Sequence, residues 1–114
     1  MQIINKTRNT LIADNAVMAA SLFSRMKGLL GKHSLNKGEA LILNPCNSIH
    51  TFFMRFTIDA LFVDKEGRII QACENIKPYR ITPIYLRSSF VIELPVGTIG
   101  SSSTSKSDKL ALIS

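Results

Sequence analysis

Residues 44 to 64 read NPCNSIHTFFMRFTIDALFVD. The stretch is rich in phenylalanine and ends in the apolar run Leu61 to Val63, a pattern typical of a buried strand. A polar turn at 64–67 follows, and Gly67 supplies the positive φ that tight hairpin loops usually need. The sequence therefore predicts a central strand that turns back at Gly67 into a partner strand at 68–73.

Short apolar runs and turn residues predict further strands on both sides of this stretch. A polar turn at 5–9 lies between two apolar pairs and predicts a hairpin within residues 1–14. Strands are predicted at 39–43, 90–94 and 109–113, the first two ended by proline. An irregular crossing loop is expected at 77–89. The serine-rich segment 100–107 is expected to be a mobile loop, because it has little apolar surface to bury.

One helix is predicted, from Ala16 to Leu30. Apolar residues recur there with a spacing that places them on one face, namely Met18, Leu22, Met26, Leu29 and Leu30. Asp14 or Asn15 can cap the start of this helix. Several short strands with one helix predict a mainly β domain (α+β by content). We expect a compact barrel-like or jelly-roll sandwich with the helix, from the N-terminal half, packed on it.

Length and composition favour one globular domain spanning residues 1–114. The 114 residues are 46% hydrophobic and 19% charged, which is ordinary for a folded domain. No apolar run approaches the ~18 residues needed to span a bilayer, and the first residues do not read as a secretory signal. We therefore expect a cytoplasmic monomer with no membrane partner, in which Cys46 and Cys73 are free thiols.

The net charge of +6 and the pI near 9.7 raise the question of nucleic-acid binding. The fourteen basic residues are scattered, however, and the densest groups, at 25–37 and 77–87, are not runs. No aromatic residue is interleaved with the first group as a base-stacking platform would require. Nucleic acid is therefore not an expected partner, and binding through a basic surface stays open as a second alternative.

Cys46 and His50 offer one kind of chemistry. In an extended chain they share a face with Ser48, and they could act as a nucleophile and its base, or bind a metal together with His33 and either Cys73 or an acidic residue. Four residues of strand would separate the Cys46 and His50 backbones by ~13 Å, which is too far for a hydrogen bond. Paired C-x-x-C or H-x-H spacings are lacking. We therefore predict no metal and no cofactor, and keep Cys46 and His50 as candidates for an alternative function.

Polar residues among the phenylalanines are the most informative ones. The planar guanidinium of Arg55 suits a carboxylate or phosphate, and Asp59 follows four residues later. The alternative for Arg55 is structural, a buried ion pair with Asp59 or Glu93. The apolar neighbours are expected to form the core, since burying each contributes ~1.5–3 kcal/mol. These neighbours are Phe52, Phe53, Met54, Phe56, Leu61, Phe62 and Val63.

The sequence resembles the domain-of-unknown-function family 192. The likeness runs from about Leu11 to Leu110 and is carried by RMKGLL, GEAL, FVIEL and above all CNSIHTFFMRFTIDALFVDKEG at 46–67. That last segment is similar to a subgroup reading C-x-S-I-H-T-F-x-M-R-F-P-I-D, with Thr57 in place of the proline. The resemblance implies a small, mostly β domain with one short helix and no established reaction. The family motif maps onto Arg25, Gly28, Met54, Asp59, Asp64, Glu93 and Asp108.

The leading functional hypothesis is a non-catalytic binding or accessory domain. It would hold a small polar or anionic ligand, or a segment of a partner, in a cleft beside Ser48, His50, Arg55 and Asp59. The first alternative is an enzyme or metal-binding protein that uses Cys46 and His50. The residues favour a protein that is not an enzyme, because the nucleophile and base are poorly spaced.

Overall fold

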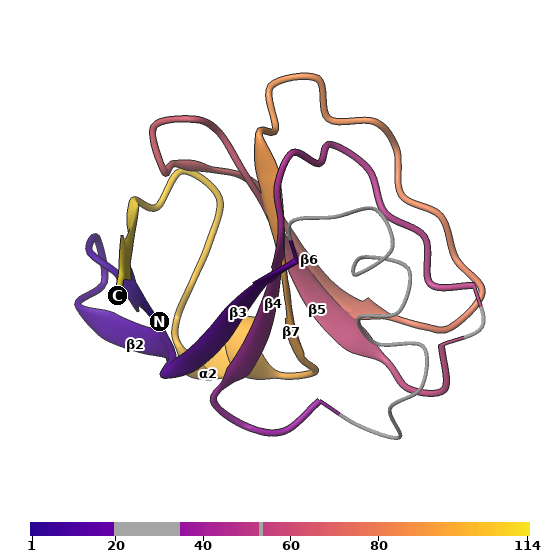
Figure 1. Cartoon of the computed structure of the whole chain (residues 1–114), viewed down its shortest axis with the longest axis horizontal. Helices are drawn as coiled ribbons and strands as arrows, with labels where there is room; N and C mark the ends of the chain where they lie inside the picture. The colour runs from indigo at the N-terminus through magenta and orange to yellow at the C-terminus, as the bar shows by residue number, and fades with distance from the viewer. Residues whose placement is uncertain (20–34, 53) are drawn as a thin grey trace.

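The computed structural model describes residues 1–19, 35–52 and 54–114. In this part of the chain the strands form a sheet of order β2-β1-β8 and a larger sheet of order β3-β4-β7-β5-β6 (Figure 1). The elements are β1 (Gln2–Asn5), β2 (Thr10–Ala13), β3 (Asn15–Ala19), β4 (Glu39–Leu43), β5 (Ile58–Val63), β6 (Ile69–Ile76), β7 (Phe90–Pro95), α2 (Thr98–Ser101) and β8 (Leu110–Ile113). The predicted mainly β, sandwich-like fold is confirmed. The two sheets do not close into a barrel.

Most of the predicted strands are present. The hairpin within residues 1–14 is formed by β1 and β2, and the last strand, β8, pairs with β1 on its other edge. The strand predicted at 39–43 is β4, and the strand predicted at 90–94 is β7, which lies antiparallel between β4 and β5. The turn at 64–67 joins β5 to β6 as expected.

Strand β5 lies inside the larger sheet, and all six of its residues are buried. Because neighbouring side chains of a strand point to opposite faces, Leu61 and Val63 join one apolar cluster whereas Ala60 and Phe62 join another. The first cluster includes residues of the smaller sheet, such as Ile3 and Leu110. The second includes residues of the loop before β5, namely Cys46, Ile49 and Met54. The larger sheet is therefore covered on both faces.

Residues 15–19 form a strand, so the predicted start of the helix at Ala16 is wrong. Strand β3 pairs in parallel with β4, with Asn15 opposite Glu39 and Ala19 opposite Leu43. Pairing with a distant segment here overrides the helical spacing of apolar residues. Such spacing is weak evidence for a helix when the apolar run is short. The remainder of the predicted helix, 20–30, lies outside the described residues.

The stretch 44–57 does not continue β5 backwards as a strand. Its described residues, 44–52 and 54–57, are irregular, and their backbone bonds to the crossing loop 77–89, which is itself irregular as predicted (Figure 1). The bonds joining the two segments are Thr51 N to Arg80 O (2.8 Å), Thr82 N to Ile49 O (3.0 Å), Tyr85 N to Asn47 O (2.9 Å) and Cys46 N to Ser89 O (3.0 Å). The face that Cys46, Ser48 and His50 would share in a strand is consequently absent: Cys46 is buried and His50 is exposed.

The serine-rich segment 100–107 is held in place, so the expectation of a mobile loop is wrong. Ser102 and Thr104 are buried. The Asn5 amide donates to Thr104 Oγ1 (3.1 Å), and the Thr10 hydroxyl donates to the Ser102 carbonyl (2.7 Å). These hydroxyl side chains can be buried because their hydrogen bonds are made within the protein. The segment is therefore fixed by hydrogen bonds and needs few apolar contacts.

Helix α2 opens this serine-rich segment and has four residues. Within the described ranges, no helix has the length and apolar character needed to cross a membrane.

Replacing Gly67 by alanine is expected to destabilise the protein by roughly 1–3 kcal/mol. Gly67 has a φ of +87°, and an added Cβ would lie 3.0 Å from the Leu110 carbonyl oxygen. Gly97 is a matched control, because its φ is +92° and nothing lies within 4 Å of the Cβ position. Urea unfolding should show a larger loss for Gly67→Ala than for Gly97→Ala. Equal losses would mean that the carbonyl contact carries no cost.

Candidate functional site

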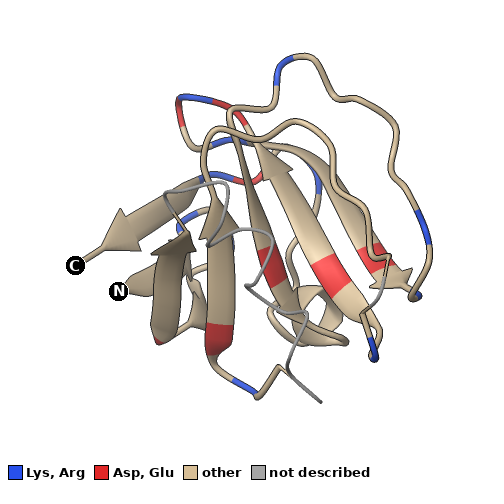
Figure 2. Cartoon of the chain, turned by 45° about the vertical axis from the view of Figure 1, so that its right-hand side comes forward, with Lys and Arg blue, Asp and Glu red and all other residues tan. Residues whose placement is uncertain are grey.

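Asp59 is fully buried in β5, and its carboxylate accepts three backbone hydrogen bonds. One oxygen accepts from Asn75 N at 3.0 Å, and the other from Gly97 N at 3.1 Å and Ile99 N at 3.0 Å. Asp59 thereby joins the end of β6 to the turn that leads into α2. Figure 2 shows acidic residues within strands of the larger sheet and most basic residues in the connections. The carboxylate faces protein backbone and not an open cleft.

Arg55 lies before β5 and is exposed. It therefore does not form the buried ion pair with Asp59 or Glu93 that we considered as the structural alternative, and the oxygens of Asp59 are occupied by backbone N–H groups. Arg8 forms an ion pair with Asp108 (3.1 Å). Arg55 remains available to an anionic partner at the surface.

Cys46 and His50 do not interact with each other. The Cys46 thiol donates to the Ser48 carbonyl oxygen at 3.1 Å. His50 Nδ1 accepts from Phe52 N at 3.3 Å, and its ring stacks on Phe52 with centroids 5.1 Å apart. A nucleophile–base pair needs the two side chains within hydrogen-bond reach, so these contacts do not support the catalytic alternative.

The metal alternative also lacks support among the residues described. No group of three or more His, Cys, Asp or Glu side chains comes together in residues 1–19, 35–52 and 54–114. Cys46 and Cys73 are free thiols, as expected. His33, the other histidine considered, lies outside the described residues.

Cys73 forms a pair that the sequence does not reveal. Burial raises the pKa of the Cys73 thiol and outweighs the opposing effect of its hydrogen bond with Tyr85. Burial, together with the charge and hydrogen bond of Cys73, raises the pKa of Tyr85. The Tyr85 ring also packs against Phe62, with centroids 4.5 Å apart. Because the thiolate is the reactive form, this cysteine is suited to packing and not to nucleophilic chemistry.

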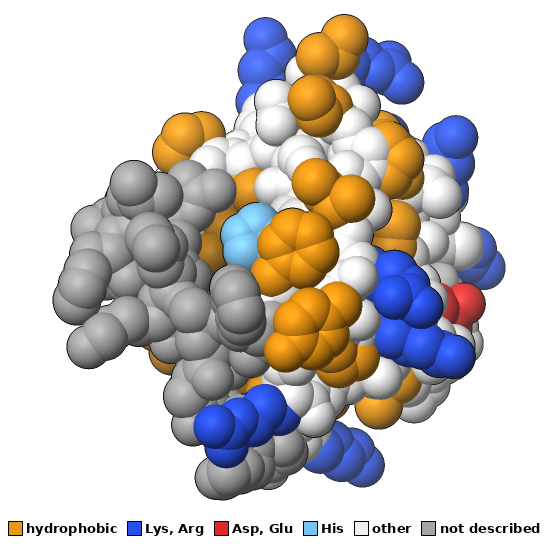
Figure 3. Space-filling model, turned by 90° about the vertical axis from the view of Figure 1, so that its right-hand side faces the viewer, with side chains coloured by type: hydrophobic (Ala, Val, Ile, Leu, Met, Phe, Trp, Pro, Cys, Tyr) orange, Lys and Arg blue, Asp and Glu red, His pale blue; other side chains and the backbone are white. Residues whose placement is uncertain are grey.

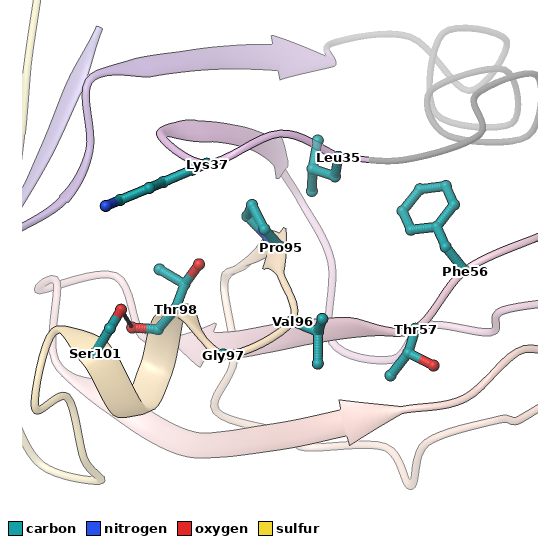
Figure 4. A pocket seen from close by; sticks show the side chains of 9 residues that line it. All are labelled: Leu35, Lys37, Phe56, Thr57, Pro95, Val96, Gly97, Thr98 and Ser101. Carbon is teal, nitrogen blue, oxygen red and sulfur yellow. Dashed lines mark hydrogen bonds between the residues drawn. The ribbon is translucent and has the colours of Figure 1, made fainter.

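One pocket, of about 520 Å³, opens beside α2. Leu35, Phe56, Pro95 and Val96 provide apolar walls (Figure 4). Lys37 is the charged residue among the described residues of the lining, and its side chain extends toward the end of the pocket that contains Thr98 and Ser101 (Figure 4). The remaining lining residues are Thr57 and Gly97. Asp59 supports this pocket indirectly, because its carboxylate accepts hydrogen bonds from the backbone of Gly97, which lines the pocket, and of Ile99.

A second pocket, of about 550 Å³, is formed by the start of the 44–57 stretch and the end of the crossing loop. The described residues that line it are Asn44, Pro45, Cys46, Asn47, Ser48, Ser88 and Ser89, and none of these is charged. The hydroxyl of Ser48 donates weakly to the Thr82 carbonyl at 3.4 Å. Ser48 is thus the predicted ligand-binding residue that lines a pocket.

The four predicted ligand-binding residues do not converge on either of these pockets. Ser48 lines the uncharged pocket, His50 and Arg55 are exposed, and Asp59 is buried beneath the other pocket. The residues that sequence reasoning missed are Lys37, Val96 and Thr98. Lys37 and Val96 lie in connections next to strand ends, and Thr98 is the first residue of α2. No local signal distinguishes Lys37 from the other lysines of the chain.

Comparison with known proteins places the chain in a family. The model of the DUF192 family, described as uncharacterized ACR, matches residues 3–112. The chain belongs to the DUF192 family. The resemblance that rests on the 46–67 segment is therefore confirmed. The family is uncharacterised, and the match shows no catalytic role.

Relatives and a solved structure agree with this assignment. A UPF0127 protein of Thermococcus sibiricus is 30% identical over 101 residues, which are 85% of this chain and 65% of that protein. This chain thus spans just under two thirds of that relative. A UPF0127 protein of Pyrococcus horikoshii is 30% identical over 100 residues, covering 83% of this chain and 84% of that protein. The crystal structure of a protein of unknown function from Novosphingobium aromaticivorans superposes with a TM-score of 0.84 at 18% identity, covering 98% and 84% of the two chains. At that identity the likeness shows the fold alone.

Proposed function

We propose that this DUF192 chain is a non-catalytic binding domain that holds a small anion with an apolar body in the pocket beside α2. The observation that carries the proposal is the position of Lys37, a cation on the lining of a pocket whose walls are Leu35, Phe56, Pro95 and Val96. Ligand sites commonly combine apolar walls with a few placed polar groups, and their volumes run from about 300 to 1,000 Å³. A monocarboxylate with a short aliphatic or aromatic body matches this lining.

The chemistry of the lining favours a carboxylate over a cation. No acidic residue is among those that line the pocket. The carboxylate of Asp59, which bonds to the lining residue Gly97, is occupied by the backbone N–H groups of Gly97 and Ile99. Thr57 and Thr98 add hydroxyl groups that can donate to a carboxylate oxygen, whereas the Ser101 hydroxyl donates to the Thr98 carbonyl at 3.3 Å. Lys37 then supplies the charge-assisted contact and the hydroxyls supply orientation.

The proposal gives Asp59 an indirect role. The Asp59 carboxylate accepts hydrogen bonds from the 97–99 backbone, which forms one wall of the pocket. Ser48, His50 and Arg55 are not among the residues that line this pocket. The proposal retains the cytoplasmic location expected from the sequence, which is supported by the two free thiols.

Replacing Lys37 by glutamine is expected to weaken binding of a monocarboxylate about tenfold, because one charge-assisted hydrogen bond is lost. The measurement is an NMR titration of the whole chain with benzoate and octanoate, beside the neutral partners benzamide and octanol. Amide shifts at Val96 and Thr98 report on the pocket. Lys65→Gln is the matched control, since Lys65 is an exposed lysine in the β5–β6 turn.

A steric variant separates the pocket from general surface charge. Val96→Trp is expected to fill the space and abolish the shifts with the thermal midpoint unchanged, because Val96 is exposed. Equal binding of benzoate and benzamide, or unchanged binding by Lys37→Gln, would show that no anion site exists at this pocket.

A second candidate is a neutral polar ligand in the pocket lined by Ser48. Its amide and hydroxyl lining, with no charged group, favours a polyol or an amide over an anion. The same titration with glycerol and acetamide would then shift the amides of Asn47 and Ser89 and leave those of Val96 and Thr98 unchanged.

A further inference from the structure

The loop pair, which we define as residues 44–52, 54–57 and 77–89, carries an unusual share of exposed apolar side chains. The two segments are joined by backbone bonds, and a β-bridge links His50 to Ile81. Of the eleven large apolar side chains that are exposed in the described residues, five belong to the loop pair. Their exposed fractions are 39% for Phe52, 59% for Tyr79, 70% for Ile81, 64% for Ile84 and 87% for Leu86. Exposed apolar groups gathered in this way mark a contact surface.

The loop pair is also basic. It contains Arg55, Lys77, Arg80 and Arg87, and there is no Asp or Glu between residues 44 and 58 or between residues 75 and 92. All four basic residues are exposed. Figure 3 shows hydrophobic side chains gathered beside the histidine on one face, with basic side chains around them. A partner that covers this surface must therefore accept aliphatic side chains and carry negative charge.

We propose that the loop pair docks on the surface of an anionic lipid bilayer. Ile81, Ile84 and Leu86 would enter the boundary between headgroups and acyl chains, where exposed aliphatic side chains lose contact with water. Arg80 and Arg87 would stay among the headgroups, because long basic side chains keep their charge at the interface. The charge matches the cytoplasmic leaflet, which is negative and attracts basic segments.

Three other occupants fit the same residues less well. A second copy of the chain would bring like charges together across a symmetric interface. A single-stranded nucleic acid would use aromatic rings for stacking, whereas the most exposed side chains here, Ile81 and Leu86, are aliphatic. An acidic amphipathic peptide would need a groove, and neither of the two pockets described above is lined by Ile81, Ile84 or Leu86.

Peripheral docking does not require a membrane-spanning segment. The expectation that a membrane is not a partner rested on the lack of a long apolar run, which excludes a spanning helix only. The proposal does not depend on ligand binding in the pocket beside α2. Phe56 and Thr57, at the end of the loop pair, line that pocket, but Ile81, Ile84 and Leu86 do not.

The test is co-sedimentation of the whole chain with vesicles. We expect at least tenfold stronger partitioning into vesicles of 70% phosphatidylcholine and 30% phosphatidylserine than into phosphatidylcholine alone. The preference should fall as salt rises from 50 to 500 mM, because exposed charges are screened.

Paired variants separate the two contributions. Arg80→Gln with Arg87→Gln is expected to weaken partitioning into the anionic vesicles about 25-fold, at about fivefold per charge. Ile84→Ser with Leu86→Ser is expected to weaken it at least tenfold at every salt concentration. The matched control is Lys6→Gln with Leu11→Ser, a basic and an apolar residue exposed on the N-terminal hairpin, and it should bind as the unmodified chain does. Circular dichroism checks that each variant is folded.

Several results would overturn the proposal. One is no partitioning into the anionic vesicles at 50 mM salt. Another is that the charge variant loses binding whereas the Ile84→Ser, Leu86→Ser variant binds as strongly as the unmodified chain. Tight binding of a short oligonucleotide or of an acidic peptide, with no vesicle binding, would assign the surface to that partner instead.

Discussion

Replacing Asp59 by alanine is expected to lower the free energy of unfolding by roughly 3–5 kcal/mol, because it leaves buried donors without acceptors. The carboxylate accepts from the backbone N–H groups of Asn75, Gly97 and Ile99, and Asp59 itself is fully buried. Small domains have about 5–15 kcal/mol of total stability, so this variant should be close to unfolded at 37 °C. Urea denaturation followed by circular dichroism measures the loss.

Two further variants make this expectation specific. Asp59→Asn retains one side-chain oxygen but places an NH₂ group opposite a backbone N–H, so a loss of about 2–4 kcal/mol is expected. Glu66→Gln is the control, because Glu66 is exposed in the β5–β6 turn, and it should change stability by less than about 0.5 kcal/mol. If Asp59→Ala unfolds at the same urea concentration as the unmodified chain, Asp59 does not support the fold, and direct contact with a ligand becomes the better explanation.

Replacing Asp108 by asparagine is expected to cost about 2–4 kcal/mol at pH 7, since hydrogen bonds to a buried carboxylate are the strong kind. Asp108 Oδ2 accepts from the Asn5 amide (2.9 Å), Arg8 Nε (3.1 Å) and Ser105 N (2.9 Å). These bonds join the segment before β8 to the turn of the N-terminal hairpin. Hydrogen exchange should show earlier opening of β1 and β8 than of β5.

The stability difference between the unmodified chain and Asp108→Asn is expected to shrink in acid. Burial alone raises the pKa of Asp108, but the hydrogen bonds from Asn5, Ser105 and Arg8 and the charge of Arg8 outweigh it, so the pKa lies below the ordinary value of 3.8. A carboxylate with a depressed pKa stabilises the folded state fully above its ordinary pKa and loses this contribution as the pH falls through the folded value. The difference should therefore be constant from pH 7 to about 5 and decrease below about 4.

A second carboxylate does not disturb this comparison. Burial raises the pKa of Asp64, but backbone hydrogen bonds from Arg68 and Glu66 and the charges of Lys109 and Arg68 lower it overall. Its contribution is present in both proteins and cancels in the difference. A stability difference that stays the same from pH 7 to pH 2 would contradict the role given to Asp108.

Much of the architecture follows from local sequence. The apolar run at 61–63, the turn ending at Gly67 and the short strand predicted at 39–43 all appear where the pattern places them. These features depend on side-chain alternation and on backbone conformations that glycine adopts easily, both of which are properties of a few neighbouring residues. The 46–67 segment also identified the family, which the family model confirms.

The candidate site could be predicted only in part. The polar residues within the apolar run predict Asp59 as a ligand-binding residue, but local sequence does not show that its carboxylate accepts from three backbone amides of distant segments. Lys37 becomes notable only because the residues around 95–98 fold next to it. In the same way, Cys46 and His50 looked like partners in sequence, whereas the bonds of the crossing loop give one a buried and the other an exposed position.

The sequence by itself determined the family, the positions of most strands along the chain, the turn at 64–67 and a core built on β5. The tertiary structure decided that residues 15–19 form a strand beside β4, that 44–57 pairs with 77–89, and that the serine-rich segment is held by Asn5. The physical reason is the range of the interactions. Apolar alternation and glycine conformation act within a few residues, whereas strand partners and buried hydrogen-bond acceptors are supplied by segments far away in the chain.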